Sequence, residues 1–147
     1  MLEVIALIRG EAAKNNVAIQ PRLAVELPRV QADRVQLQQV ILNLIVNAIE
    51  AMSAANQCAR RVVISSAGSG SDSVSVEVQD SGPGLSPGNL EHIFQAFYTT
   101  KSAGLGMGLS ICRSIIEAHG GTLRATAGNP AGAVFSFTLP VRPNDTY

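Results

Sequence analysis

The chain has 147 residues, of which 46% are apolar and 15% charged, and its formal net charge is zero. This length and composition are typical of one globular domain with its own core, and they exclude a disordered chain. The absence of a lysine or arginine cluster argues against a nucleic-acid surface, and no apolar run is long enough to span a membrane.

The N-terminal residues predict a helix followed by an edge strand. Residues 1–16 read as an amphipathic helix that carries Leu2, Ile5, Ile8 and Ala12 on one side. Residues 17–27 read as a strand, and a proline within them places that strand at an edge or a bulge.

A second helix is predicted to begin at Asp33, which together with Gln36 fits a capping box. Its apolar residues recur at three- and four-residue steps and predict a buried stripe of Leu37, Val40, Ile41, Leu44, Ile45, Ala48 and Met52.

This helix also carries a polar stripe, because Asn43 and Asn47 lie one turn apart and Glu50 continues their face. Taken alone, the two amides fit two interpretations. They bond neighbouring loops, which is the commoner case for such a pair, or they face a hydrated Mg²⁺ ion, which prefers oxygen ligands.

The next segments predict a pair of strands, residues 60–68 and 73–80, that ends in "QDSGPGL". Asp80 closes the second strand, where a carboxylate can accept a hydrogen bond from an exocyclic amine. Gly82 and Gly84 let a flat ring approach the backbone. On its own the stretch also fits a plain turn, which is the more common meaning of such residues.

The C-terminal half predicts a short helix from Ser86 to Phe94, a loop over residues 95–104 and a long helix over residues 107–119. Three alternating glycines before the long helix fit either a flexible turn or a phosphate site at a helix N-terminus, with Lys101 as a cation. Strands over residues 122–128 and 133–140 close the chain. This order predicts an α/β (α+β) fold, a two-layer sandwich with a mixed sheet of about five strands covered on one face by about three helices.

Four segments in this order resemble the ATP-binding catalytic domain of sensor histidine kinases, in the superfamily that also contains gyrase, the heat-shock chaperone ATPases and the mismatch-repair ATPases. "NLIVNAIEAM" is similar to the N box, "DSGPGL" to the first glycine box, "IFQAFYTTK" to the F box and "GLGMGLSI" to the second glycine box. The wording of the last two is most similar to the nitrogen-regulation and oxygen-sensing branch.

The resemblance implies roles for the residues of the N box and the first glycine box. It implies that Asn47 ligates a Mg²⁺ ion bridging the ATP phosphates and that Asn43 supports the metal and phosphates from one turn earlier. It implies that Asp80 accepts from the adenine amine, in a pocket shaped by Gly82 and Gly84. The cofactors implied are ATP and Mg²⁺.

The resemblance further implies a lid over the nucleotide. Phe94 and Phe97 would anchor it, and Lys101 would reach the terminal phosphate, so that Lys101 and Asn43 are the expected catalytic residues. Leu105 departs from the small polar residue of many relatives, which weakens a side-chain phosphate contact there. The lid backbone that would wrap the nucleotide comprises Gly104, Leu105, Gly106, Met107, Gly108 and Leu109.

Neither histidine fits the phosphoacceptor motif of these kinases. His92 is expected to be a surface or lid residue, and His119, at a helix C-terminus, a cation that caps the helix. The resemblance therefore implies that the chain is one domain of a longer kinase. Its partners would be a separate dimerisation domain with the phosphoacceptor histidine and a response regulator, with no nucleic acid and no direct membrane contact.

We expect a catalytic domain over residues 1–140, with a disordered tail at residues 141–147. Cys58 and Cys112 lack metal-ligand spacing, and we expect two reduced thiols, in keeping with the cytoplasm. Two other functions stay open at this point: an anti-sigma-factor-type serine kinase, which shares the fold, and a non-catalytic nucleotide-binding module.

Overall fold

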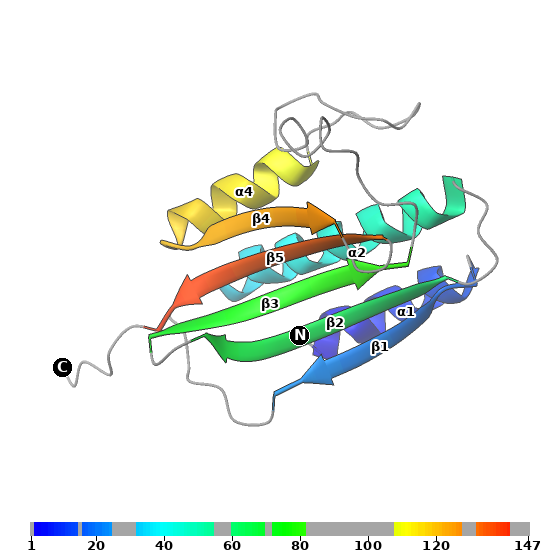
Figure 1. The fold of residues 1–147 in the computed structure, drawn as a ribbon, viewed down its shortest axis with the longest axis horizontal. Helices are drawn as coiled ribbons and strands as arrows, with labels where there is room; N and C mark the ends of the chain where they lie inside the picture. Colours follow the sequence, from blue (N-terminus) through cyan, green and yellow to red (C-terminus); the bar gives the residue numbers. More distant parts are fainter. Residues whose placement is uncertain are drawn as a thin grey trace.

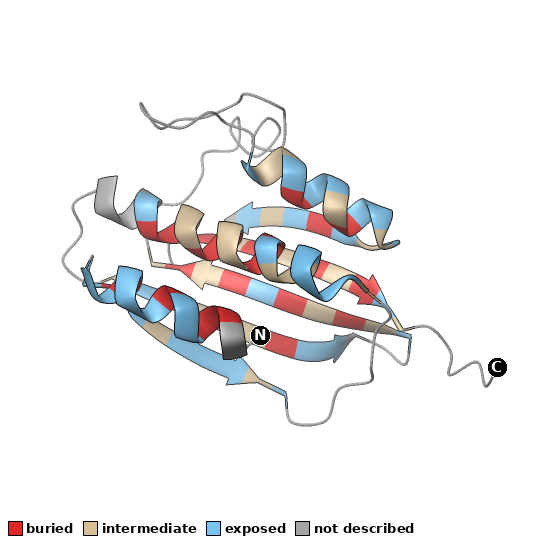
Figure 2. Cartoon of the chain, turned by 180° about the vertical axis from the view of Figure 1, so that it is seen from behind, coloured by how far each residue is buried: buried red, intermediate tan, exposed pale blue. Residues whose placement is uncertain are grey.

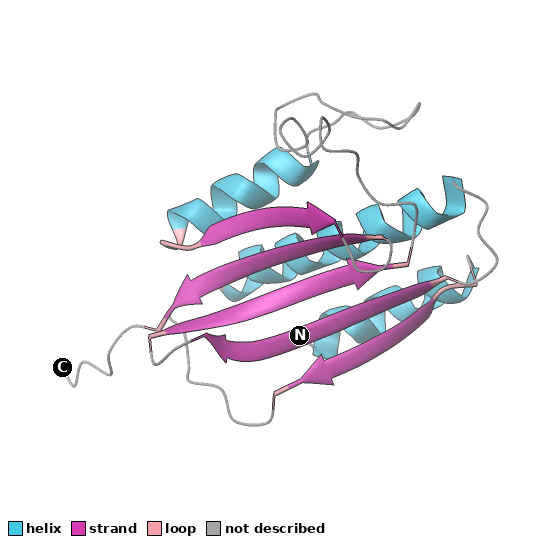
Figure 3. Ribbon diagram, viewed as in Figure 1, coloured by secondary structure: helices cyan, strands magenta, loops and turns pink. Residues whose placement is uncertain are grey.

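The computed structural model describes residues 2–14, 16–24, 32–54, 60–69, 72–81, 108–127 and 132–141, which form two layers. In this part of the chain a five-stranded sheet is covered on one face by helices (Figures 1 and 3). The helices are α1 (Leu2–Lys14), α2 (Arg34–Ala54) and α4 (Gly108–Ala118). The strands are β1 (Ala18–Leu23), β2 (Arg61–Ser69), β3 (Ser73–Asp80), β4 (Thr122–Ala127) and β5 (Ala133–Pro140).

The sheet is mixed, as the sequence predicts. Its strand order is β1-β2-β3-β5-β4, with β1 parallel to β2 and the other neighbouring pairs antiparallel. The proline of β1, Pro21, lies on an edge strand, where its missing N–H costs no ladder bond to a further strand. The expected two-layer α/β fold is confirmed.

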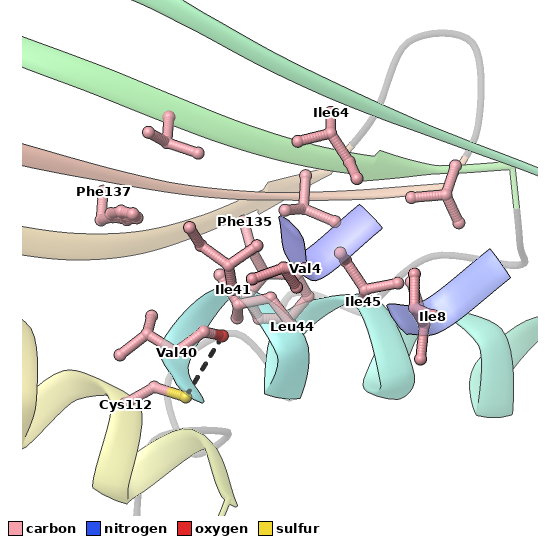
Figure 4. Close-up of a cluster of buried hydrophobic side chains, with 14 of the residues drawn as sticks. Val4, Ile8, Val40, Ile41, Leu44, Ile45, Ile64, Cys112, Phe135 and Phe137 are labelled. Carbon is pink, nitrogen blue, oxygen red and sulfur yellow. Dashed lines mark hydrogen bonds between the residues drawn. The ribbon is translucent and has the colours of Figure 1, made fainter. Parts of the chain in front are cut away.

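The core lies between the helices and one face of the sheet (Figure 2). Alternate residues of β3 and β5 are buried, in agreement with the period of two in their sequences. Figure 4 shows side chains of α1 and α2 packed beneath the strands. The buried residues include Ile5, Ile8 and Ala12 of α1, the predicted Val40, Ile41, Leu44, Ile45 and Ala48 of α2, and Phe135 and Phe137 of β5.

Helix α2 begins at a cap that the sequence predicts only in part. The Gln36 N–H donates to Asp33 Oδ1 at 3.0 Å, which is the N-cap bond. In a capping box the Asp33 N–H would bond the Gln36 side chain, but here it donates to His119 Nε2 at 3.0 Å. The start of α2 is therefore tied to the end of α4.

His119 caps α4, as expected, but not as a cation. Its Nδ1 lies 2.8 Å from the Ile115 carbonyl oxygen, while its Nε2 accepts from Asp33. A ring nitrogen that accepts a hydrogen bond carries no proton, so this arrangement needs the neutral ring with the proton on Nδ1. The contribution of His119 is two hydrogen bonds and not a charge at the helix end.

Two glycines end α4, as predicted. Gly120 has a φ of 80° and donates to the Glu117 carbonyl, while Gly121 donates to the Ile116 carbonyl at 2.9 Å. This pair of bonds is a Schellman motif. A Cβ on Gly121 would lie 1.9 Å from the Thr138 backbone oxygen, so the glycine lets the end of the helix meet β5.

We expect Gly121→Ala to lower the free energy of unfolding by roughly 2–3 kcal/mol, because the added methyl would collide with the β5 backbone. Gly10→Ala is the control: it lies within α1 with nothing within 4 Å of the added Cβ, and should stabilise by about 0.5–1 kcal/mol. Urea unfolding of both variants measures the difference. Equal stabilities would contradict the close approach of α4 and β5.

Candidate functional site

Three of the sequence motifs meet at one end of the molecule. β3 ends there at Asp80, β5 begins beside it, α2 runs toward it with Asn43 and Asn47, and α4 starts there at Gly108 (Figure 1). Segments far apart in the sequence thus bring the end of β3 with its carboxylate, the helix that carries the two amides and the N-terminus of α4 toward one end of the two layers.

Asp80 is a buried carboxylate at this end, with only 5% of its surface exposed. It lies on the core-facing side of β3, in line with the valines of that strand. Its Oδ1 accepts a hydrogen bond from the Ala133 N–H at 3.3 Å. A buried carboxylate needs such partners to stay in place, so Asp80 is more than the polar residue of a surface turn.

Gly132, which lies against the Asp80 backbone, and Ala133, which bonds its carboxylate, were not among the predicted site residues. Gly132 has a φ of 92°, and a Cβ there would lie 2.0 Å from the Asp80 backbone oxygen. A glycine directly before an alternating strand was the available signal, because it marks close approach of another backbone. Its target, however, depends on the pairing of β3 with β5.

Asn43 and Asn47 are both half-buried on α2, one turn apart, while Leu44 and Ile45 between them point into the core as predicted. The Asn43 Nδ2 donates to the Cys112 Sγ of α4 at 3.7 Å. That thiol in turn donates to the Val40 carbonyl at 3.9 Å (Figure 4). The amide group of Asn43 is therefore held at the contact between α2 and α4.

Cys112 is a buried free thiol, as expected, and burial raises its pKa from 9.0 to about 11. The folded state favours the neutral thiol, so its contribution to stability is fully present below pH 9 and is lost as the pH rises toward about 11.

We therefore expect the free energy of unfolding of wild type to fall more steeply between pH 9 and pH 11 than that of Cys112→Ala. In a Cys58→Ser background, a thiol reagent at pH 8 should label Cys112 only after unfolding. Rapid labelling of the folded chain would contradict the buried, neutral thiol.

The predicted residues of the α4 start are only partly described. Gly108 is the exposed first residue of α4, and Leu109 packs partly buried against the core. Arg113, one turn on, forms an exposed pair with Glu117 at 3.9 Å. Outside the described residues lie Gly82, Gly84, Phe94, Phe97, Lys101, Gly104, Leu105, Gly106 and Met107, together with Cys58, His92, the short helix, the loop and the tail at 142–147.

The donor set at this end suits a cation that brings most of its own ligands. Among the described residues no three His, Cys, Asp or Glu side chains gather into a metal cluster. Two half-buried amides on one helix face are too few to hold a metal by protein ligands alone. They fit Mg²⁺ better, because Mg²⁺ keeps several waters and takes phosphate oxygens.

The opposite face of the sheet is polar and carries a shallow hollow of about 340 Å³. It is lined by Ser75, Glu77, Thr122, Arg124, Ser136 and Thr138 from β3, β4 and β5. These residues alternate with the buried ones, so the hollow lies on the far side of the sheet from Asp80 and the asparagines. None of the described helices has the length and apolar character needed to cross a bilayer.

Comparisons with known proteins agree on one family. A family model described as histidine kinase-, DNA gyrase B- and HSP90-like ATPase matches residues 32–143. The sensor protein FixL of Bradyrhizobium diazoefficiens is 44% identical over 135 residues, which cover 92% of this chain and 26% of the relative. The chain thus spans about a quarter of the length of this curated relative.

Solved structures give the same result. The nucleotide-free catalytic domain of the histidine kinase ThkA matches with a TM-score of 0.81 and 38% identity, over 96% of this chain and 91% of that one. A complex of ThkA with the response regulator protein TrrA matches with a TM-score of 0.80 and 36% identity, over 97% and 40% of the two chains.

Proposed function

This chain belongs to the family of histidine kinase-, DNA gyrase B- and HSP90-like ATPases and is a catalytic domain of the sensor histidine kinase type, and from that premise we propose how it acts. It binds Mg-ATP and presents the γ-phosphate to a phosphoacceptor histidine on a separate dimerisation domain. The phosphoryl group then passes to an aspartate of a response regulator.

The observation that carries this proposal is the buried carboxylate of Asp80 at the end where α2, α4, β3 and β5 meet. A carboxylate held in place by a backbone N–H can accept a hydrogen bond from the exocyclic amine of adenine and disfavours a carbonyl at that position. This gives the site a means to distinguish ATP from GTP. Gly82 and Gly84 would shape the rest of the base pocket.

Asn47 would ligate Mg²⁺ through its side-chain oxygen, and Asn43 would support the metal and phosphates from one turn earlier. Because the Asn43 Nδ2 donates to Cys112, its oxygen is directed away from that sulfur. Held there, Mg²⁺ would supply positive charge that offsets the negative charge developing on the transferred phosphoryl group. Mg²⁺ prefers oxygen ligands and keeps several waters, so two side-chain amides would be enough protein ligands to hold it.

The lid would complete the site. Phe94 and Phe97 would anchor it, Lys101 would reach the γ-phosphate, and the glycine-rich segment with Leu105 would wrap the phosphates at the start of α4. Phosphoryl transfer depends mainly on positioning and on charge stabilisation, so these contacts are the chain's contribution to the rate.

The expected partners are the dimerisation domain of the same kinase and a response regulator. The complex of ThkA with TrrA supports the second of these, because its kinase chain is similar to this one over almost all of the domain. Use of ATP and transfer to such a regulator are cytoplasmic activities, and we propose that location for the domain.

The transfer test compares the chain alone with the chain plus a phosphoacceptor domain, each in Mg²⁺ and γ-labelled ATP. We expect no acid-labile phosphate on this chain, because neither of its two histidines fits the acceptor motif. Label should move to the added domain in the mixture. Strong acid-labile label on this chain by itself would contradict the proposed division of labour.

A further inference from the structure

Directly before β5 the backbone takes an unusual conformation that sheet pairing alone does not require. Gly132, directly before the strand, is buried and has a φ of 92°, a conformation that side-chain-bearing residues rarely adopt. It lies beside the last residue of β3, since Gln79 pairs with Val134.

The close approach is directed at one residue. A Cβ on Gly132 would lie 2.0 Å from the Asp80 carbonyl oxygen, 2.9 Å from its carbonyl carbon and 3.2 Å from Oδ1. The first two atoms are backbone, at the end of a paired strand, and cannot move aside as the tip of a flexible side chain can. Only glycine allows the two backbones this distance.

The next residue uses that proximity. The Ala133 N–H donates to Asp80 Oδ1 at 3.3 Å, and both residues are buried, at 4% and 5% exposed. Hydrogen bonds to an ionised acceptor are the stronger kind, and burial protects this one from water. Because a carboxylate is planar, holding one oxygen also restricts the direction of the whole group.

We propose that Gly132 and Ala133 are positioning residues for recognition of the base, acting through Asp80. Gly132 provides the close approach, and Ala133 holds Oδ1 so that the carboxylate meets the 6-amino group of adenine. This inference rests on the proposed function, because it takes Asp80 as the residue that reads the base.

Gly120 offers a matched control at the other end of β5. It also has a positive φ, of 80°, so an alanine there meets the same backbone penalty. Its Cβ would contact only the Pro140 ring, at 3.4 Å and beyond. Gly120→Ala therefore separates the cost of a left-handed alanine from the loss of the Asp80 contact.

The test measures dissociation constants for ATP and for purine riboside 5′-triphosphate, which lacks the 6-amino group. Wild type should bind ATP roughly tenfold more tightly. In Gly132→Ala the ratio of the two dissociation constants should fall to about one, while both nucleotides still bind. Gly120→Ala should keep the wild-type ratio even if its melting temperature drops.

A second variant covers the case in which Gly132→Ala does not fold. Ala133→Pro leaves Gly132 unchanged and replaces the N–H donor by a ring methylene that cannot bond Oδ1, and proline is tolerated as the first residue of a strand. It too should lose the preference for the 6-amino group. If a folded variant at either position keeps the wild-type ratio of the two dissociation constants, the positioning role is overturned.

The same data distinguish this inference from the proposed function. If wild type itself binds both triphosphates equally, Asp80 does not read the base, and the placement of the base pocket fails together with the inference. If wild type prefers ATP and the Gly132 and Ala133 variants do too, the pocket stands and only the positioning role is refuted.

Discussion

Asp80→Ala is expected to raise the dissociation constant for ATP by roughly tenfold to a hundredfold, because a hydrogen bond to a buried charged group contributes on the order of 1.5–3 kcal/mol. The change also leaves the buried Ala133 N–H without its acceptor. Affinity for the triphosphate portion should be reduced much less, so the ratio of ATP to GTP affinity should fall toward one. Titration calorimetry with both nucleotides measures this.

Asp80→Asn is the control that keeps the shape of the side chain. Its Oδ1 can still accept from the Ala133 N–H, which would direct its Nδ2 donor toward the 6-position of the base. A donor there repels the 6-amino group of adenine and favours a 6-oxo group. The affinity for inosine triphosphate should therefore rise relative to the affinity for ATP. Unchanged binding of ATP and GTP by Asp80→Ala would show that the base pocket lies elsewhere.

Asn47→Ala is expected to abolish the strengthening of ATP binding by Mg²⁺. The affinity for ATP measured in the presence of the metal should fall on the order of a hundredfold. The amide is half-buried on α2, and alanine is the better helix former, so the fold should be retained. The measurement is the dissociation constant for ATP with Mg²⁺ and with EDTA.

Gln39→Ala, an exposed polar residue of the same helix, is the matched control and should keep the wild-type response to Mg²⁺. A persistent effect of Mg²⁺ in Asn47→Ala would remove this side chain from the set of metal ligands.

Much of the fold follows from local patterns. The spacing of Val40, Ile41, Leu44 and Ile45 predicts the buried face of α2, and the alternating valines of β3 predict which side of that strand is buried. The position of Asp80 follows in turn, because the carboxylate continues the alternation of the valines. Gly120 and Gly121 likewise predict the end of α4, because glycine is the usual residue of a helix C-cap.

The contacts that could not be predicted from the sequence join residues far apart in the chain. His119 bonds Asp33 across 86 positions, so a pattern read along α4 indicates a helix cap but not the neutral ring that α2 requires. Ala133 reaches Asp80 across 53 positions, and Asn43 reaches Cys112 across 69. Such partners are set by how strands and helices pair, which periodicity within one element does not encode.

The proposed roles of the lid stay predictions, because Phe94, Phe97, Lys101 and the preceding glycines lie outside the described residues. The support for these roles is the order of the four sequence motifs. In the chain, the segment lies between the end of β3 and the start of α4.

The most direct test of the account is calorimetric titration of the chain with ATP, with and without Mg²⁺, and with GTP as the competing base. We predict that ATP binds, that Mg²⁺ strengthens this binding, and that GTP binds at least tenfold more weakly, as expected for a buried carboxylate that reads an amine. Equal affinities for ATP and GTP, or no binding of ATP in the presence of Mg²⁺, would contradict an ATP site built on Asp80, Asn43 and Asn47.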